Sequence, residues 1–254
     1  RRIPKTANDL RSKVRQIRDY CDSRVVSASV MDHMARFLVV VDNWTRDLGL
    51  DATAIQCCTS IQENFGIVPC TLMSLMSNQG RPSACEVDIT GTLSMYALQL
   101  AAGQPSAILD WNNNYGEDPD KCVLFHCSSI PVDMLNQPRI GFHEIIADTV
   151  GKDNTCGPMF GRLKPGPFTF LRLTTDETTG RIKGYAGEGT ITDDPLETFG
   201  GYGVAHIEKL QELMRLVTNA QFEHHVSATL AECCDVLDEA LGNYLDYDLH
   251  THNL

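Results

Sequence analysis

Acidic side chains at two places in the sequence could bind a cation or transfer a proton. Glu86 and Asp88 come just before a helix-like segment, where capping and the helix dipole favour carboxylates without any chemistry. Asp110 ends an apolar segment and is followed by Trp111 and Asn112. Because the carboxyl ends of strands face the ligand crevice in α/β folds, Asp110 is a better candidate than an acid in an ordinary loop. The position of Asp88 at the helix entrance is enough to explain a carboxylate there, so we expect the substitution Asp88→Asn to have a mild effect.

Imidazole side chains occur at two further places. His126 ends the next apolar segment, and His224 and His225 form an adjacent pair late in the chain. A histidine at a strand end is also compatible with a structural role, so both interpretations stay open. Carboxylate oxygens with imidazole nitrogens suit Mn²⁺ or a similar divalent cation better than a cation that prefers thiolates. If Glu86, Asp110 and a histidine converge in the fold, they form an open catalytic metal site.

Several other kinds of chemistry lack their sequence motifs. The chain has no Walker A phosphate loop, no GxGxxG after a strand and no GxSxG nucleophile elbow. The glycine-rich residues 199–203 are typical of a tight turn. The formal charge of −12 offers no basic surface to nucleic acid, and the longest apolar stretch, residues 37–41, is far too short to span a bilayer. We therefore expect no nucleic-acid partner and no membrane partner.

The ten cysteines indicate a reducing compartment. Two adjacent pairs and several thiols among apolar residues are typical of reduced core cysteines, and no CxxC motif indicates a zinc ribbon or a redox pair. Disulfide frameworks are expected mainly in short secreted chains. Residues 1–5 also lack the apolar segment of a secretory signal. We therefore predict free thiols and a cytoplasmic location.

Helical and extended patterns alternate in the first half of the chain, and they predict the elements that position the acidic candidates. Helices are predicted within residues 1–49 and over 69–79 and 89–100, and strands over 51–57, 106–111 and 121–127. This alternation predicts a layered α/β domain with a largely parallel sheet over residues 1–130. Both acidic candidates belong to this domain.

The composition changes after about residue 128, where proline and glycine become frequent. Residues 168–174 and 181–185 are predicted to form a hairpin, and helices are predicted over 205–218 and 229–241. These patterns indicate a smaller antiparallel, barrel-like domain with flanking helices over residues 131–254. This second domain carries the late histidine pair.

Several short motifs of this chain resemble, in their order and spacing, those of the superfamily of L-fucose isomerase and L-arabinose isomerase, in particular the fucose-isomerase-like proteins. The motifs are residues 54–57, 64–70, 84–91, 110–113, 124–131, 166–172, 187–189 and 222–226. In L-fucose isomerases, a glutamate of an E-x-D motif, an aspartate at the next strand end and a late histidine bind Mn²⁺. The resemblance therefore implies Glu86, Asp110 and one of His224 and His225, with His225 slightly preferred, as metal ligands. It assigns catalytic roles to Glu86 and Asp110.

The function that this resemblance implies is aldose–ketose isomerisation of the L-fucose isomerase type, through a metal-stabilised enediol. The cation stabilises the developing oxyanion while a carboxylate moves the proton between C1 and C2 of the open-chain sugar. His126 matches a metal histidine of the arabinose isomerases or lines the sugar pocket. Trp111 and Asn112 are expected to bind the sugar substrate. The resemblance also implies a homo-oligomer, either a trimer or a hexamer.

Family members are longer, and the resemblance covers their middle and C-terminal portion without the N-terminal domain. We expect little activity from the isolated chain, because that domain closes part of the sugar pocket in the family. A second interpretation stays open, namely a non-catalytic sugar-binding or assembly module of the same fold, which Mn²⁺ affinity would distinguish from the enzyme. A metal-dependent hydrolase with the same ligands is a third, although no nucleophile arrangement supports it.

Overall fold

One large sheet dominates the fold. Some of its neighbouring strands are joined by short connections, and others come from distant parts of the sequence. The computed structural model describes residues 7–253 and has the mixed α/β class that the sequence predicts. Within these residues, nine strands form one sheet and two form a small parallel sheet. The strands are β1 (Thr53–Ala54), β2 (Ser83–Ala84), β3 (Ser106–Asn114), β4 (Lys121–His126), β5 (Leu135–Phe142), β6 (Cys156–Leu163), β7 (Gly166–Thr175), β8 (Ile182–Thr192), β9 (Gly201–His206), β10 (His225–Thr229) and β11 (Asp248–His252). The helices are α1 (Ala7–Tyr20), α2 (Ala28–Leu48), α3 (Ser60–Phe65), α4 (Cys70–Asn78), α5 (Ile89–Ala102), η1 (Val132–Met134), α6 (Ala147–Val150), η2 (Lys152–Asn154), α7 (Leu210–Asn219), α8 (Cys234–Leu237) and η3 (Asp238–Tyr244).

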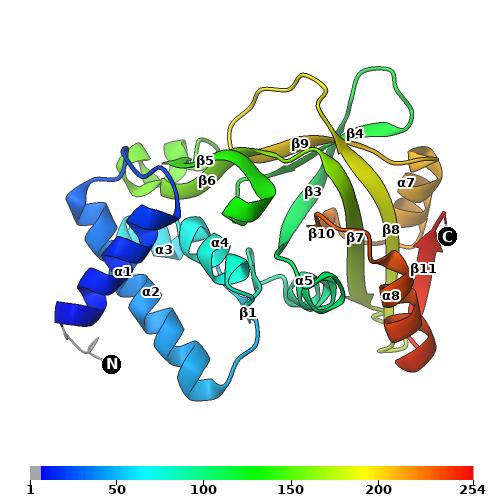
Figure 1. Ribbon diagram of the computed structural model, residues 1–254, viewed down its shortest axis with the longest axis horizontal. Coiled ribbons are helices and arrows are strands. Elements are labelled where there is room, and N and C mark those ends of the chain that lie inside the picture. Colours follow the sequence, from blue (N-terminus) through cyan, green and yellow to red (C-terminus); the bar gives the residue numbers. More distant parts are fainter. Residues whose placement is uncertain (1–6, 254) are drawn as a thin grey trace.

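Six strands of the large sheet close into a ring (Figure 1). The strand order is β11-β8-β7-β10-β3-β4-β9-β6-β5, and β8 also pairs with β9. Every pairing within the ring of β3, β4, β9, β8, β7 and β10 is antiparallel. Closure gives each strand of the ring a neighbour on both sides, which removes exposed sheet edges. An antiparallel barrel-like structure is present, as the sequence predicts, but β3 and β4 join it from before residue 131, where the sequence predicts a largely parallel sheet.

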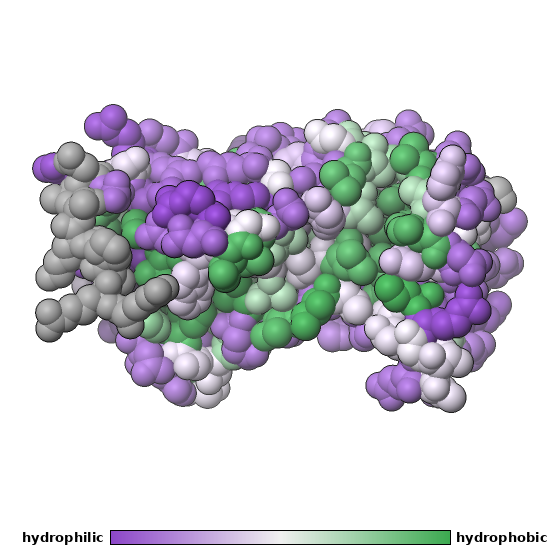
Figure 2. All heavy atoms as spheres, turned by 90° about the horizontal axis from the view of Figure 1, so that it is seen from below, coloured by the Kyte–Doolittle hydropathy of each residue, from purple (hydrophilic) through white to green (hydrophobic). Residues whose placement is uncertain are grey.

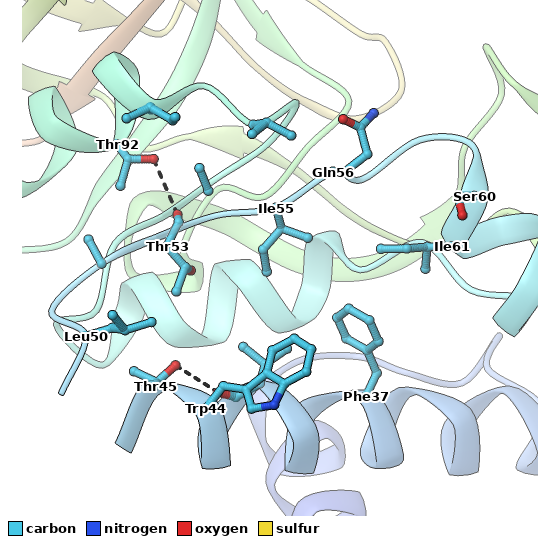
Figure 3. A pocket seen from close by; sticks show the side chains of 15 residues that line it. Phe37, Trp44, Thr45, Leu50, Thr53, Ile55, Gln56, Ser60, Ile61 and Thr92 are labelled. Carbon is cyan, nitrogen blue, oxygen red and sulfur yellow. Dashed lines mark hydrogen bonds between the residues drawn. The ribbon is translucent and has the colours of Figure 1, made fainter. Parts of the chain in front are cut away.

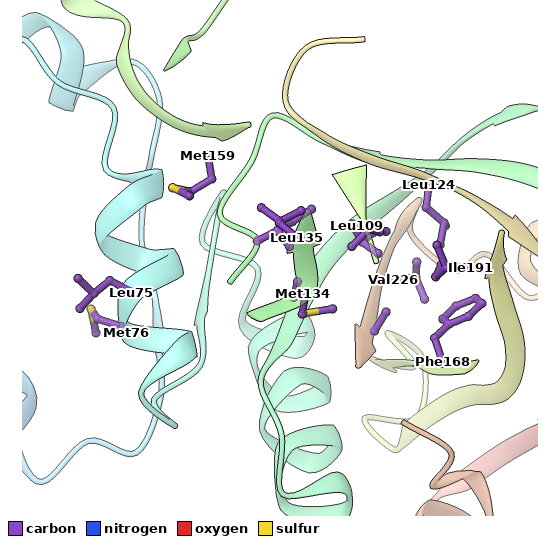
Figure 4. Close-up of a cluster of buried hydrophobic side chains, with 14 of the residues drawn as sticks. Leu75, Met76, Leu109, Leu124, Met134, Leu135, Met159, Phe168, Ile191 and Val226 are labelled. Carbon is purple, nitrogen blue, oxygen red and sulfur yellow. The ribbon is translucent and has the colours of Figure 1, made fainter. Parts of the chain in front are cut away.

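Side chains on one face of the ring strands fill the barrel interior, and those on the other face pack against helices outside it. Phe168 and Phe170 of β7 belong to the main buried cluster, part of which Figure 4 shows. Leu171 and Leu173 of the same strand belong to a second cluster that includes Leu98 of α5. Because side chains of a strand alternate between its two faces, the first pair lies inside the barrel and the second outside, under α5. Packing of this kind fixes α5 against β7 and its neighbours.

The N-terminal helices α1 and α2 lie at one end of the molecule, and β8, β11 and α8 lie at the opposite end (Figure 1). The Ser27 side chain accepts a hydrogen bond from the Val30 N–H and caps α2, and Gly49 ends the helix with a left-handed φ of 63°. The predicted helical stretch 1–49 is confirmed as two helices, although residues 1–6 lie outside the described part of the chain. Over residues 7–253, no helix is long and apolar enough to cross a membrane.

Parallel pairing is rarer than the sequence pattern indicates. β1 and β2 are parallel, as are the pairs β6–β9 and β8–β11, whereas β3 and β4 pair antiparallel. Residues 115–120 explain this difference, because so short a connection permits a hairpin, whereas parallel neighbours need a crossover of a dozen or more residues. The predicted division at residue 130 stays a prediction, and β3 and β4 share their sheet with strands from beyond it.

Two predicted helices differ from the observed elements. The segment 205–218 completes β9 before α7 begins at Leu210, and the segment 229–241 contains the end of β10, the short α8 and part of η3. β10 is extended because its Val226 and Ala228 side chains fill the barrel while the alternate residues face α5. All ten cysteines lie within the described residues and are free.

Candidate metal centre

A tight turn before α5 presents Glu86 and Asp88. Glu86 and Val87 both have left-handed backbone conformations, with φ of 60° and 57°, which are uncommon for residues other than glycine. The Val87 N–H donates to the Ile55 carbonyl and so ties the turn to the chain after β1. Asp88 is the N-cap of α5, and its Oδ1 accepts a hydrogen bond of 2.8 Å from the Gly91 N–H. The predicted helix entrance is therefore confirmed, and Oδ2 of Asp88 remains for other partners.

Neighbouring strands place Asp110 opposite His225. β3 pairs with β10, and these two residues are direct partners in the register. Their side chains therefore share one face of the sheet, and His225 Nε2 lies 3.5 Å from Asp110 Oδ1. The same nitrogen lies 3.8 Å from Glu86 Oε2. Two strands and one turn thus bring two carboxylates to a single imidazole nitrogen.

His126 lies beside this group at the end of β4. It is 1% exposed, and its ring centroid lies 5.7 Å from that of His225. Asp110, His126 and His225 each offer a ligand atom, and these atoms lie within 4.8 Å of one another. We call Glu86, Asp110, His126 and His225 the acid–imidazole cluster. Its members come from three strands and one turn, which no local sequence pattern brings together.

Buried charges hold His225 in a fixed orientation. Asp88 Oδ2 lies 2.9 Å from His225 Nδ1 and accepts a hydrogen bond of 2.6 Å from Arg172. Arg172 is 2% exposed and also donates to Glu223, at 3.2 Å. Burial raises the pKa of Asp88, but the hydrogen bonds from His225 and Arg172 outweigh burial and lower it. Asp88 is therefore ionised, and by holding Nδ1 it turns Nε2 of His225 toward the cluster.

The electrostatics at His126 favour positive charge. Burial lowers the pKa of His126, but Cys127, Asp110 and Glu86 together raise it to about 10. Cys127 Sγ lies 3.8 Å from His126 Nδ1. A hydrogen bond with Cys70 lowers the pKa of the Cys127 thiol, burial opposes this, and His126 lowers it further, to well below its usual range. The same negative groups would stabilise a bound cation.

The other three predicted site residues, His224, Trp111 and Asn112, are not members of the acid–imidazole cluster. His224 is 70% exposed, with Nε2 3.4 Å from Asp110 Oδ1. Trp111 follows Asp110 on β3, so its side chain faces the barrel interior, where Nε1 donates to the Tyr185 hydroxyl at 2.8 Å. Asn112 is exposed at a β-bulge between β3 and β4. Neither Trp111 nor Asn112 is brought into the acid–imidazole cluster.

An apolar groove of about 720 Å³ adjoins the turn before α5. Phe37 and Trp44 of α2 and Ile55 after β1 line it (Figure 3). Val87 of the turn is also among its lining residues. Trp44 is 56% exposed, and apolar residues also appear at several places on the underside of the molecule (Figure 2). No member of the acid–imidazole cluster lines the groove. The groove and the cluster are therefore two separate features, both next to the turn before α5.

Asp88, Arg172 and Glu223 are the residues of this site that the sequence does not reveal. The expectation that Asp88 acts only at the helix entrance is corrected, because its carboxylate also binds Arg172 and His225. A signal was present in the predicted strand 168–174, where an arginine lies between the apolar residues Leu171 and Leu173. Because a buried charge requires a partner, this arginine could have been matched to a nearby carboxylate.

Known proteins share both the barrel segment and much of the rest of the chain. The family described as L-fucose isomerase, C-terminal domain, matches residues 124–252, about half of the chain. Sulfoquinovose isomerases of Priestia aryabhattai and Priestia megaterium are 28% identical over 215 residues, covering 84% of this chain and 47% of theirs. The sulfoquinovose isomerase of Alkalicoccus urumqiensis is 28% identical over 215 residues, covering 80% of this chain and 45% of its own. The chain thus spans about half the length of the curated relatives it matches. The matched segment contains the barrel strands β7, β8, β9 and β10 together with His126 and His225, and the chain belongs to the family of L-fucose isomerase C-terminal domains.

Proposed function

We propose that this chain carries the metal site of an aldose–ketose isomerase, with Glu86, Asp110 and His225 as ligands and His126 beside them. The observation that supports this proposal is the approach of Glu86 and Asp110 to one nitrogen of His225, at 3.8 and 3.5 Å. Family membership supports the sugar as substrate class, since the matched relatives are named as sugar isomerases. The cytoplasmic location and the homo-oligomer, a trimer or hexamer, stay predictions.

The donor atoms fit a divalent cation such as Mn²⁺. Carboxylate oxygens and imidazole nitrogens are ligands that such ions accept, and they can leave positions open for a substrate. His225 is held at Nδ1 by the buried Asp88 carboxylate, an arrangement that fixes the tautomer and orientation of metal-binding histidines. When bound, the cation polarises the sugar carbonyl and stabilises the negative charge that develops on the sugar oxygens.

The two carboxylates divide the proton transfers in this proposal. Isomerisation removes a proton from C2, returns one to C1, and moves a hydroxyl proton from O2 to O1. Glu86 is 49% exposed and therefore open to a substrate, so we assign to it the transfer between C2 and C1. Asp110 is 19% exposed and held beside His224 and His225, so we assign to it the transfer between the oxygens.

A second candidate function is a sugar-binding or assembly module of the same fold that does not turn over substrate. One observation favours it, namely that the chain spans about half the length of its curated relatives. If a region of those relatives beyond the matched half closes the sugar pocket, this chain has the fold without turnover of its own. A chain without Mn²⁺ affinity favours this alternative.

Ketose formation in deuterium oxide tests the proposal. The purified chain is incubated with Mn²⁺ and a panel of aldoses that includes L-fucose and sulfoquinovose. An enediol mechanism places solvent deuterium at C1 of the ketose, and Glu86→Gln or Asp110→Asn should lower the rate at least about 10²-fold. Glu63→Gln, on exposed α3, is the matched control and should leave the rate unchanged. Mn²⁺ binding with little ketose agrees with the low activity expected of the isolated chain, whereas no Mn²⁺ binding refutes the proposed metal site and favours the module.

A further inference from the structure

We propose that Glu86, His126 and Cys127 form a second cation position, one that contains a thiolate and binds thiophilic divalent cations such as Cd²⁺. Each of the three residues offers a ligand atom, and these atoms lie within 4.8 Å of one another. His126 also belongs to the group with Asp110 and His225. The two ligand sets therefore share one imidazole, and a single cation can occupy only one of them at a time.

The geometry of Cys127 is already close to what a metal ligand needs. Its Sγ lies 3.8 Å from His126 Nδ1. Around a tetrahedral ion of the zinc type, with bonds of about 2.3 Å to sulfur and about 2.1 Å to nitrogen, these two atoms lie about 3.6 Å apart. β4 pairs with β3 and β9, which fixes the backbone at His126. Glu86 is half exposed, so its side chain can turn to close the site.

The sides of His126 differ in the hardness of their ligand atoms. On the Asp110 side the groups are carboxylate oxygens and an imidazole nitrogen. On the other side Cys127 contacts Cys70, which belongs to a buried cluster with Cys57 and Cys85. Thiolate ligands select soft cations, whereas carboxylates suit hard ones such as Mn²⁺. His126 therefore lies at a boundary between a hard site and a soft site.

Occupation of the soft site has a direct consequence for the hard one. A cation held by Glu86, His126 and Cys127 withdraws Glu86 from Asp110 and His225, and its charge on the shared His126 ring repels a second cation at that side. Thiophilic cations are then inhibitors of any reaction that uses the acid–imidazole cluster, and removal of the cation restores it. This inference concerns cation binding, so its test does not depend on the proposed isomerase activity.

Titration of the metal-free chain with Cd²⁺ tests the inference. A sulfur-to-cadmium charge-transfer band should appear in the ultraviolet and saturate at one cation per chain. Cys127→Ser should remove the band and weaken Cd²⁺ binding by more than about 10- to 100-fold, since that range applies to residues that only support a ligand and Cys127 is a ligand itself. Cys122→Ser is the matched control, because Cys122 is a buried thiol on β4, the strand that Cys127 directly follows, and belongs to neither ligand set; this variant should keep the band.

Two further measurements keep the inference falsifiable if a variant folds poorly. In the unsubstituted chain, Cd²⁺ should slow alkylation of Cys127 by iodoacetamide at least about tenfold, as mapped by mass spectrometry, and a chelator should reverse this. Asp110→Asn should keep the Cd²⁺ band while it weakens Mn²⁺ binding. A band that persists in Cys127→Ser would assign the cation to the Cys57, Cys70 and Cys85 cluster and overturn the proposal. So would equal alkylation of Cys127 with and without Cd²⁺.

Discussion

Replacement of Asp88 by Asn should destabilise the protein strongly, although Asn is as good a helix cap as Asp. The reason lies in how the two carboxylate oxygens are used. Oδ1 accepts the Gly91 N–H at 2.8 Å, and Oδ2 accepts Arg172 at 2.6 Å and faces His225 at 2.9 Å. Asn has one oxygen and one NH₂ group. Whichever way its amide is turned, a donor faces a donor, at either Gly91 or Arg172.

The magnitude follows from the burial of Arg172. Its side chain is 2% exposed, and removal of one partner from a buried ion pair costs about 3–5 kcal/mol. Glu223 remains as a second partner but is 44% exposed, so it compensates only part of the loss. We therefore expect about 3 kcal/mol, which for a chain of this length lowers Tm by about 6–12 °C. His225 also loses the group that orients it, and Mn²⁺ affinity should fall by about 10- to 100-fold.

Urea unfolding followed by circular dichroism measures the stability change, and calorimetric titration measures the Mn²⁺ affinity. The double variant Asp88→Asn with Arg172→Met should be more stable than Asp88→Asn alone, because it removes the buried charge that lost its partner. Glu86→Gln is the control, since Glu86 is half exposed and should lose less than about 0.5 kcal/mol. A loss below about 1 kcal/mol in Asp88→Asn, with unchanged Mn²⁺ affinity, would refute the structural role assigned to Asp88.

The remaining predictions concern the ligands, the barrel interior and a buried thiol. Asp110→Asn and Glu86→Gln should each weaken Mn²⁺ binding, and their combination should cost far less than the sum, because both serve one ion; calorimetric titration of the three variants checks this. Trp111→Phe should lower the unfolding free energy by about 1–2 kcal/mol, since Tyr185 loses its hydrogen bond, and should leave Mn²⁺ affinity unchanged; weaker Mn²⁺ binding would contradict its placement in the barrel. Burial raises the pKa of Cys122 to about 12, so the folded chain keeps this proton while the unfolded chain releases it near pH 8.5. Its contribution to stability is complete below pH 8.5 and should be lost by about 1.4 kcal/mol per pH unit above it, and Cys122→Val should flatten the measured slope in alkaline urea titrations.

Features that depend on neighbouring residues could be predicted from the sequence. The hairpin of β7 and β8 is an example, because Asp176 accepts hydrogen bonds from the backbone of Thr178 and Thr179 within the turn itself. The cap of α2 at Ser27 and its end at Gly49 are equally local. Each of these features is determined within a few residues, and each was found where the pattern indicates.

Features that depend on distant pairing could not be predicted in this way. β10 is five residues long and has only two apolar side chains, Val226 and Ala228, in the barrel, so its pattern is too short to distinguish it from a loop. Its place between β7 and β3 results from hydrogen bonds with strands far away in the sequence. The network around Asp88 has the same origin, because Arg172 reaches it from β7. The family resemblance was therefore needed to group the proposed ligands, and the structure was needed to show that Asp88 and Arg172 support them.

The position of β10 also bears on how the protein is made. β10 lies between β7 and β3 in the sheet, yet every other strand of the ring precedes it in the chain. During synthesis, which proceeds from the N-terminus, Glu86, Asp110 and His126 are all present before the strand that joins β3 to β7 emerges. His225 is the first residue of that strand, so a single late event closes the ring and delivers the last member of the acid–imidazole cluster. A nascent or truncated chain that stops before this strand therefore has an open sheet and lacks His225, so its acid–imidazole cluster is incomplete.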